Sequence, residues 1–254
     1  MRLYEPRMPV GLDEFTRAAQ EICSDARMYR FSGIRPDPIL LKMDSGQGRT
    51  CAARYITDLF HMHEVLDFAS SREDCLEFVL DGTLPQMRSV LEEIRAAAEY
   101  DNVYREVTAI DISALADHLN ETQTAEFLDR VRTLCQDAFV IFFVHRETGV
   151  REDRLIERLY ERVPQLQTIE TDLYTADELA EITARILEEK GIVIEDRANV
   201  VASIRTLLNE GTMDMTEARA AAARLLRRCD YTGVRASIDE AAVRAEYQMK
   251  KGGH

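Results

Sequence analysis

The sequence contains no long hydrophobic run, and this absence excludes a membrane-spanning helix. Its most apolar segment, Ala138–Val144, is far shorter than the ~20 residues that cross a bilayer. The N-terminus also lacks the apolar region of a secretory signal peptide. We therefore expect a cytoplasmic protein with no membrane partner.

Cysteine is scarce as well, and its spacing excludes a disulfide framework and a zinc site. The five cysteines are odd in number, lie far apart and form no C-x-x-C pair. We interpret them as reduced packing residues: Cys23, Cys51, Cys75, Cys135 and Cys229. The spacing of the other reactive side chains indicates no Ser-His-Asp, Cys-His or paired-carboxylate site.

The chain has few positive residues relative to negative ones. It contains 32 Lys and Arg residues and 46 Asp and Glu residues, which give a net charge of −14. Such a charge opposes non-specific attraction to the phosphate backbone of nucleic acid, which depends on clustered Lys and Arg. Contact with DNA through a local basic patch stays open. Nucleic acid is nevertheless not the expected partner of this chain alone.

The sequence does contain alternating strand and helix patterns over its first two thirds. Short apolar or β-branched runs predict strands at Pro38–Met43, Glu64–Ala69, Glu106–Ile112, Ala138–His145 and Leu166–Glu170. Apolar residues three and four apart predict helices at Leu12–Arg30, Thr50–Met62, Leu84–Tyr100 and Leu115–Leu134. The almost continuously apolar fourth strand is typical of a parallel sheet covered on both faces. The expected fold class is α/β, with a five-stranded parallel sheet flanked by helices.

After Asp172 the strand pattern stops, and the remaining chain predicts a bundle of about four helices. Thr175 with Glu178, and Ser237 with Glu240, have the spacing of capping boxes at helix starts. We therefore expect an α/β nucleotide-binding domain over residues 1–171, a small helical domain over 172–249 and a disordered tail over 250–254.

The segment Pro38–Thr57 has the strand, glycine-bearing loop and helix that surround a phosphate-binding loop. In the pattern G-x-x-x-x-G-K-S/T, glycines let backbone N–H groups curl around an anion at a helix N-terminus. Gly46, Gly48 and Thr50 fit this loop, whereas Met43 and Arg49 stand where a glycine and a lysine are expected. The alternative is an ordinary strand-to-helix turn.

An acidic residue, Asp111, lies near the C-terminal end of the third predicted strand. In α/β nucleotide sites an aspartate at such a position holds magnesium together with the hydroxyl group of the phosphate loop. Asp111 and Thr50 are therefore the candidate magnesium ligands. A strand-end cap is the alternative role for Asp111.

The order of these features resembles the AAA+ ATPase superfamily, and particularly its branch of red-type rubisco activases and stage V sporulation ATPases. The resemblance spans nearly the whole chain, and it implies that the second domain is a helical lid. Besides the phosphate loop and the strand ending at Asp111, it rests on Gly11-Leu12, Gly82-Thr83-Leu84-Pro85, Arg162-Val163-Pro164, Tyr174–Leu179 and Glu217-Ala218-Arg219.

The resemblance implies ATP or ADP with magnesium as the cofactor, held by Gly46, Gln47, Gly48, Arg49, Thr50, Cys51 and Arg219. It also implies that Arg162 reaches the nucleotide of a neighbouring subunit and that Arg219 is the arginine sensor of the lid. His145 follows the fourth strand, where the family senses the terminal phosphate, and Phe78 becomes a candidate pore aromatic. The alternatives are solvated helix arginines for Arg162 and Arg219 and a core position for Phe78.

Ile112 departs from the family pattern, because family members carry a glutamate directly after the aspartate to orient the attacking water. An aliphatic side chain cannot polarise water or accept a proton. Arg49 has a planar group longer than that of lysine, and Met43 adds bulk where glycine gives freedom. The sequence thus predicts a pseudo-ATPase that binds nucleotide weakly and serves as a structural or regulatory subunit.

Two other functions stay open. One is an active remodelling ATPase that uses a glutamate from elsewhere, and the other is a nucleotide-free protein-interaction domain. The expected partners are protein subunits, either an active AAA+ protein or further copies of this chain. Replacing Ile112 by Glu, Arg49 by Lys and Met43 by Gly is expected to raise ATP turnover by restoring the family pattern.

Overall fold

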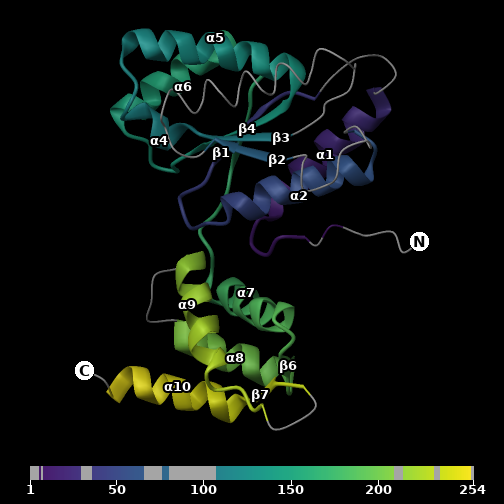
Figure 1. Cartoon of the computed structure of the whole chain (residues 1–254), viewed down its shortest axis with the longest axis vertical. Coiled ribbons are helices and arrows are strands. Elements are labelled where there is room, and N and C mark those ends of the chain that lie inside the picture. Colours follow the sequence, from purple (N-terminus) through teal and green to yellow (C-terminus); the bar gives the residue numbers. More distant parts are fainter. Residues whose placement is uncertain are drawn as a thin grey trace. The chain divides into compact units, whose positions relative to one another are not determined.

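The computed structural model describes residues 6, 8–29, 36–65, 76–79, 107–208, 214–231 and 235–252. The chain forms two compact units, Met1–Thr171 and Asp172–His254 (Figure 1). None of the helices in the described ranges is long and apolar enough to span a bilayer.

The first unit is built on a five-stranded sheet with the strand order β2-β3-β4-β1-β5. All neighbouring strands in it are parallel. The strands are β1 (Ile39–Lys42), β2 (Leu76–Val79), β3 (Val107–Asp111), β4 (Phe139–Val144) and β5 (Gln167–Glu170). The predicted α/β fold with a parallel sheet and flanking helices is confirmed.

The second strand lies further along the chain than expected. The predicted strand at Glu64–Ala69 is wrong at its described start, because Glu64 has a φ of 59° and Val65 donates its N–H back to Phe60 O. Strand β2 instead contains Phe78, which pairs in register with Ala109 of β3. A position within the sheet argues against Phe78 as a pore-loop aromatic.

Two further predictions cannot be compared with the structure. The expected helix at Leu84–Tyr100 and the pore-like segment Gly82-Thr83-Leu84-Pro85 lie outside the described residues.

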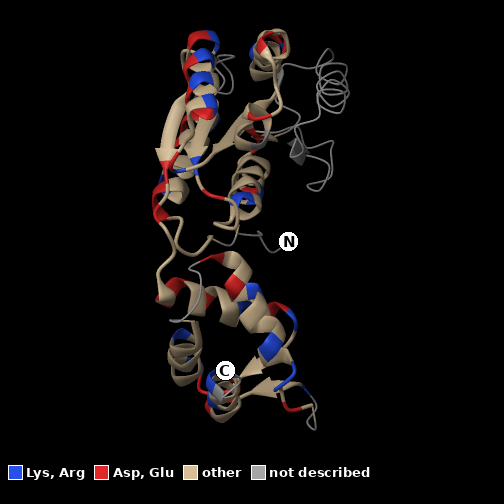
Figure 2. Ribbon diagram, turned by 90° about the vertical axis from the view of Figure 1, so that its left-hand side faces the viewer, with Lys and Arg blue, Asp and Glu red and all other residues tan. Residues whose placement is uncertain are grey.

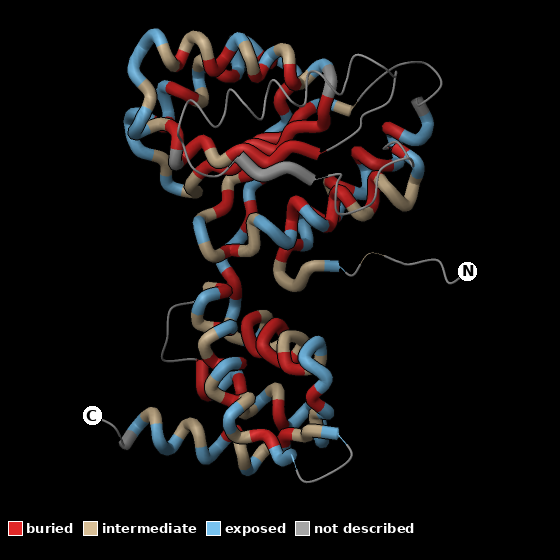
Figure 3. The backbone as a smooth tube through the Cα atoms, viewed as in Figure 1, coloured by how far each residue is buried: buried red, intermediate tan, exposed pale blue. Residues whose placement is uncertain are grey.

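Helices cover both faces of the sheet. Helices α1 (Asp13–Tyr29) and α2 (Arg49–Met62) lie on one face, and α4 (Ile112–Ala116), α5 (Glu121–Asp137) and α6 (Val150–Arg162) lie on the other (Figure 1). Every residue of β4 is buried (Figure 3). Phe139 meets Phe60 of α2 with ring centroids 4.8 Å apart, whereas Phe142 packs into the cluster beneath α5 and α6. Successive side chains therefore fill opposite faces, as the period of a strand requires.

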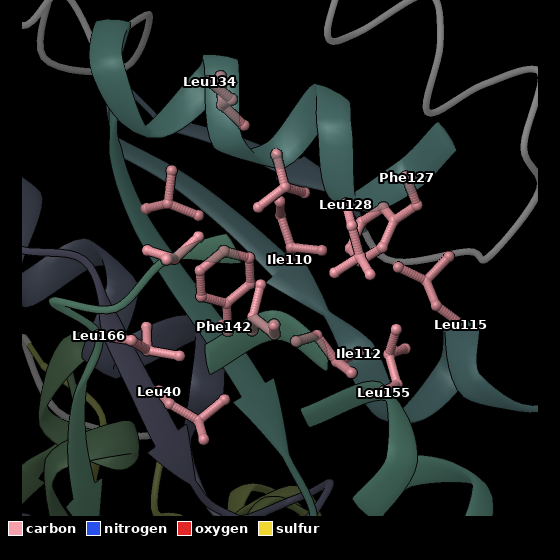
Figure 4. Packing of buried hydrophobic residues seen from close by; sticks show 14 of the residues in the cluster. Leu40, Ile110, Ile112, Leu115, Phe127, Leu128, Leu134, Phe142, Leu155 and Leu166 are labelled. Atoms are coloured by element: carbon pink, nitrogen blue, oxygen red, sulfur yellow. The ribbon is translucent and has the colours of Figure 1, made fainter. Parts of the chain in front are cut away.

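A hydrophobic cluster joins the sheet to α4, α5 and α6 (Figure 4). It includes Ile110 from β3, Phe142 from β4, Phe127 from α5 and Leu155 from α6. Burying one such side chain contributes about 1.5–3 kcal/mol, so the cluster holds the strand ends in fixed positions.

The second unit is mainly helical. It contains α7 (Ala176–Glu189), β6 (Val193–Ile194), α8 (Arg197–Leu208), α9 (Met215–Leu226), β7 (Ser237–Ile238) and α10 (Glu240–Gly252). The capping box at the start of α7 is confirmed, because Thr175 Oγ1 accepts from the Glu178 N–H and Glu178 Oε2 accepts from the Thr175 N–H. Strands β6 and β7 form a short parallel pair that periodicity did not predict.

Two predictions about the last helix are wrong. Ser237 belongs to β7 rather than capping α10, and Asp239 Oδ1 accepts the N–H of Ala242 instead. Helix α10 also continues to Gly252, so the proposed tail begins as helix, with Lys250 Nζ donating to Leu207 O. Lys250 Nζ also lies 3.7 Å from Glu217 Oε1, so polar contacts join this end of α10 to α8 and α9.

The cysteines differ sharply in exposure, which corrects the view that all are packing residues. Cys23 and Cys229 are buried and Cys135 is partly buried, whereas Cys51 is exposed in the first turn of α2. Burial raises the pKa of the Cys23 and Cys135 thiols to about 12. Arg27 partly opposes the effect at Cys23.

We predict that iodoacetamide at mildly alkaline pH labels Cys51 and spares Cys23 and Cys135. The reason is that the thiolate is the reactive form, and a raised pKa in a buried site leaves little of it. Peptide mass spectrometry of the labelled protein reads each position separately. Labelling of all three in urea is the control, and rapid native labelling of Cys23 would contradict the buried site.

Candidate functional site

The candidate site lies where the C-terminal ends of β1, β4 and β3 meet at one edge of the sheet. The strand registers place Lys42 opposite Val144 and Phe143 opposite Asp111. The loop that follows β1 leads directly into α2. In open parallel α/β sheets, ligands bind outside these strand ends where the strand order reverses.

The loop between β1 and α2 is sharply curled. Gly46 and Gly48 have φ values of 85° and 96°, in the left-handed region that glycine enters without steric cost. The Gln47 N–H donates to Asp44 O at 3.1 Å, which closes a turn inside the loop. Gly48 is the N-cap of α2 and provides no side-chain cap. A helix start reached through such a loop can face an anion.

Met43 fits this loop without strain. Its N–H donates to Val144 O at 2.9 Å, which extends the pairing of β1 with β4, and its side chain is fully buried. Among the described residues that are not glycine, only Glu64 and Asp196 have positive φ. Met43 therefore acts as a continuation of the strand, and its bulk is accommodated in the core.

Arg49, the first residue of α2, reaches across the end of β4. Its Nε donates to Met43 O at 2.7 Å, its Nη1 to Asp111 Oδ2 at 2.6 Å and its Nη2 to Ser113 Oγ at 3.2 Å. The guanidinium carbon lies 5.6 Å from the centroid of the Phe143 ring. Only 10% of the Arg49 side chain and 17% of the Asp111 side chain are exposed. A charge-assisted hydrogen bond of this kind is among the strong ones.

Both carboxylate oxygens of Asp111 accept hydrogen bonds within the chain. Oδ2 accepts from Arg49, and Oδ1 accepts from the Ser113 hydroxyl group at 2.8 Å. Thr50, the other candidate magnesium ligand, is exposed on α2. The structure thus pairs Asp111 with Arg49 and Ser113, a residue that the sequence reasoning missed although it lies two positions after Asp111.

The partners of Asp111 leave its carboxylate poorly placed to bind a magnesium ion. Mg²⁺ needs near-octahedral oxygen ligands, usually including a carboxylate. Here the carboxylate of Asp111 already holds a guanidinium nitrogen at 2.6 Å, and a second cation beside it would be repelled. In the described ranges, no group of three or more His, Cys, Asp and Glu residues could hold a metal.

Ile112 lies in the hydrophobic core of the first unit. It begins α4, its side chain is 0% exposed, and it packs in the hydrophobic cluster with Leu115 and Leu155 (Figure 4). A glutamate at this position would place its carboxylate among apolar side chains. The location argues against the expectation that Ile112→Glu, with changes at Arg49 and Met43, would raise turnover.

His145 is held by a buried carboxylate that the sequence reasoning missed. Glu152 Oε1 accepts the His145 N–H at 2.8 Å, and Oε2 lies 3.1 Å from His145 Nδ1. Glu152 is 5% exposed and lies in the first turn of α6, where the helix dipole favours an acidic side chain. Asp44 binds the backbone of the next residue, since its Oδ1 accepts the Arg146 N–H at 3.1 Å.

The two candidate arginines outside the loop belong to different units. Arg162 ends α6 and pairs with Asp129 of α5 at 3.1 Å, and it lines a surface cavity of about 690 Å³ with Arg132 and Glu161. Arg219 is exposed on α9 in the second unit. Acidic and basic residues are interspersed along the described helices (Figure 2).

The architecture of this chain is also found among solved structures of other proteins. In particular, it is similar to the RuvB Holliday junction branch migration motor of Thermotoga maritima, with a TM-score of 0.60, 16% identity, and coverage of 94% of this chain and 70% of that chain. A single-residue mutant of that RuvB gives a TM-score of 0.58 and 17% identity over 96% of this chain and 73% of that chain. No protein-family model matches the chain, and no curated protein matches it in sequence.

We predict that Ile112→Glu lowers the free energy of unfolding by more than ~3 kcal/mol, because it buries a carboxylate without a partner. Ile112→Val is the matched control and should cost about 1 kcal/mol. Urea unfolding followed by circular dichroism measures both. If the two variants are equally stable, the side chain at 112 reaches solvent and the buried position is incorrect.

Proposed function

We propose that this chain is an AAA+-type pseudo-ATPase, a domain that binds ATP or ADP weakly and does not hydrolyse it. The supporting observation is the burial of Ile112, which leaves a core side chain where the family resemblance places the water-orienting glutamate. Hydrolysis needs a group within hydrogen-bond reach of the attacking water. An aliphatic residue inside the core provides none.

Three carboxylates that the structure describes at this edge of the sheet are already engaged. Both oxygens of Glu152 contact His145, and Asp44 Oδ1 accepts the Arg146 N–H. The Asp111 carboxylate holds Arg49 and Ser113. An active ATPase would have to free one of these groups or bring in another, which makes hydrolysis the less favoured proposal.

Weak nucleotide binding is supported by the curled loop. Gly46 and Gly48 adopt the left-handed conformation that a phosphate loop needs, and α2 starts directly behind them without a side-chain cap. By the family resemblance, the second unit would then act as the helical lid and Arg219 as its arginine sensor. These features favour a nucleotide binder over a nucleotide-free interaction domain.

The proposed role is that of a structural or regulatory subunit in a cytoplasmic assembly of AAA+ proteins. Arg162 would reach the nucleotide of a neighbouring subunit from the end of α6, where its side chain is 43% exposed beside a cavity of about 690 Å³. The neighbour would be an active AAA+ protein or another copy of this chain. The net charge of −14 supports protein partners over nucleic acid.

We expect an ATP turnover far below the ~1 s⁻¹ at which slow working enzymes begin, together with a small rise in melting temperature at millimolar ADP. Gly48→Ala should abolish that rise, because alanine at a φ of 96° is strained. Gly149→Ala is the matched control, since Gly149 has a φ of −87° and open space around it.

Coupled-enzyme turnover and thermal unfolding test this proposal. Turnover near the rate of working enzymes would refute the pseudo-ATPase. No thermal shift and no calorimetric heat with ADP or ATP would instead favour the nucleotide-free domain.

For Arg162, we predict that the wild-type chain raises the ATP turnover of a catalytically intact AAA+ partner. Arg162→Ala should reduce that stimulation at least about tenfold, since an arginine supplied across a subunit boundary stabilises phosphate charge. Arg244→Ala removes another exposed arginine and should have no effect. Equal partner turnover with wild type, Arg162→Ala or no added chain would exclude the trans-acting role.

A further inference from the structure

We infer that Arg49 is the built-in cation of this site, and that its guanidinium takes the place that a divalent metal would otherwise hold between Asp111 and a bound phosphate. The site is therefore one for a free di- or triphosphate rather than its magnesium complex. This inference rests on the phosphate loop of the proposed function and adds the chemical form of its ligand.

The first support is the position of the guanidinium. Arg49 lies at the junction of the loop and the helix, and its guanidinium group contacts Asp111 at the end of β3, 62 positions away in sequence. In a phosphate-loop enzyme the metal occupies this location, between the loop and the strand-end aspartate. A lysine ammonium is a compact charge on a flexible stem and cannot form the same forked contact.

The second support is the number of hydrogen-bond donors. A guanidinium has five N–H groups in a fixed fork. Arg49 directs its Nε to Met43 O and one N–H each from Nη1 and Nη2 to Asp111 and Ser113. One N–H on Nη1 and one on Nη2 remain for an oxygen of a phosphate group. A single side chain can therefore join a phosphate to Asp111, as a metal ion does elsewhere.

The third support is burial. The Arg49 and Asp111 side chains are 10% and 17% exposed, and Phe143 covers one side of the guanidinium at 5.6 Å. Separating this pair to admit a metal would leave a mostly buried arginine without its partner, which is costly. The metal would have to displace Arg49 rather than join it.

A direct test uses Mn²⁺ as a spectroscopic probe for the metal position, without nucleotide. We expect the wild-type protein to leave the electron paramagnetic resonance signal of free Mn²⁺ unchanged at millimolar concentration. Arg49→Gln should create a site that binds Mn²⁺ at least about tenfold more tightly, and Arg49→Gln with Asp111→Asn should lose it. Arg54→Gln, an exposed arginine on the same helix, is the control.

A second test measures ADP binding by calorimetry, with EDTA or with magnesium. The wild-type protein should bind ADP equally well or more weakly with magnesium than with EDTA. The Arg49→Lys variant should bind ADP roughly tenfold more tightly with magnesium, because lysine leaves the Asp111 carboxylate available to the metal. The Arg49→Lys arm also covers the case in which Arg49→Gln fails to fold.

The outcomes separate this inference from the proposed function. A wild-type site for Mn²⁺, or wild-type ADP binding that tightens with magnesium, would overturn the built-in cation. Absence of ADP binding under both conditions would remove nucleotide from the proposed function, while the Mn²⁺ measurements would still decide whether Arg49 excludes the metal. High ATP turnover would refute the pseudo-ATPase separately.

Discussion

The complete burial of β4 is the constraint on which the first unit depends. Its side chains alternate between α2 on one face and the cluster under α5 and α6 on the other, so a slip by one residue would move each set to the opposite face and disrupt its packing. Because β4 lies between β1 and β3, it also fixes where their ends stand. The carbonyl group of Val144 holds Met43, and Phe143 supports Arg49. The candidate site is thus assembled on rigid strand ends rather than within a free loop.

On this support, the Arg49 and Asp111 pair balances charge within the chain. A mostly buried carboxylate needs a counter-charge, and an arginine that donates three hydrogen bonds provides one permanently. The Asp111 carboxylate therefore has partners on both oxygens without a ligand. This internal pairing fits the proposed role of a structural or regulatory subunit that binds nucleotide weakly.

The likeness to RuvB concerns the fold, whereas the residues at the candidate site determine the chemistry of this chain. Two residues at the candidate site depart from the family pattern. Ile112, which follows the strand-end aspartate, is buried in the core. Arg49 stands where a lysine is expected and donates a hydrogen bond to that aspartate. Together they favour a nucleotide site without hydrolysis over an active motor.

The sequence by itself determined the features that depend on neighbouring residues. The apolar run of β4, the capping box at Thr175 and the glycines of the loop were all recognisable, because periodicity and backbone preference act within a few positions. The sequence also showed that Ile112 and Arg49 depart from the family pattern. It could not show which way either side chain turns.

Only the tertiary structure decided the contacts between distant segments. Arg49 and Asp111 meet because β4 brings the ends of β1 and β3 together, although 62 positions separate the two residues. The same packing places Ile112 in the core and joins His145 to Glu152. It also places β2 at Leu76–Val79, where a short apolar run could not be distinguished from its neighbours. Local pattern defines the elements, but the order of strands in the sheet determines which side chains share a site.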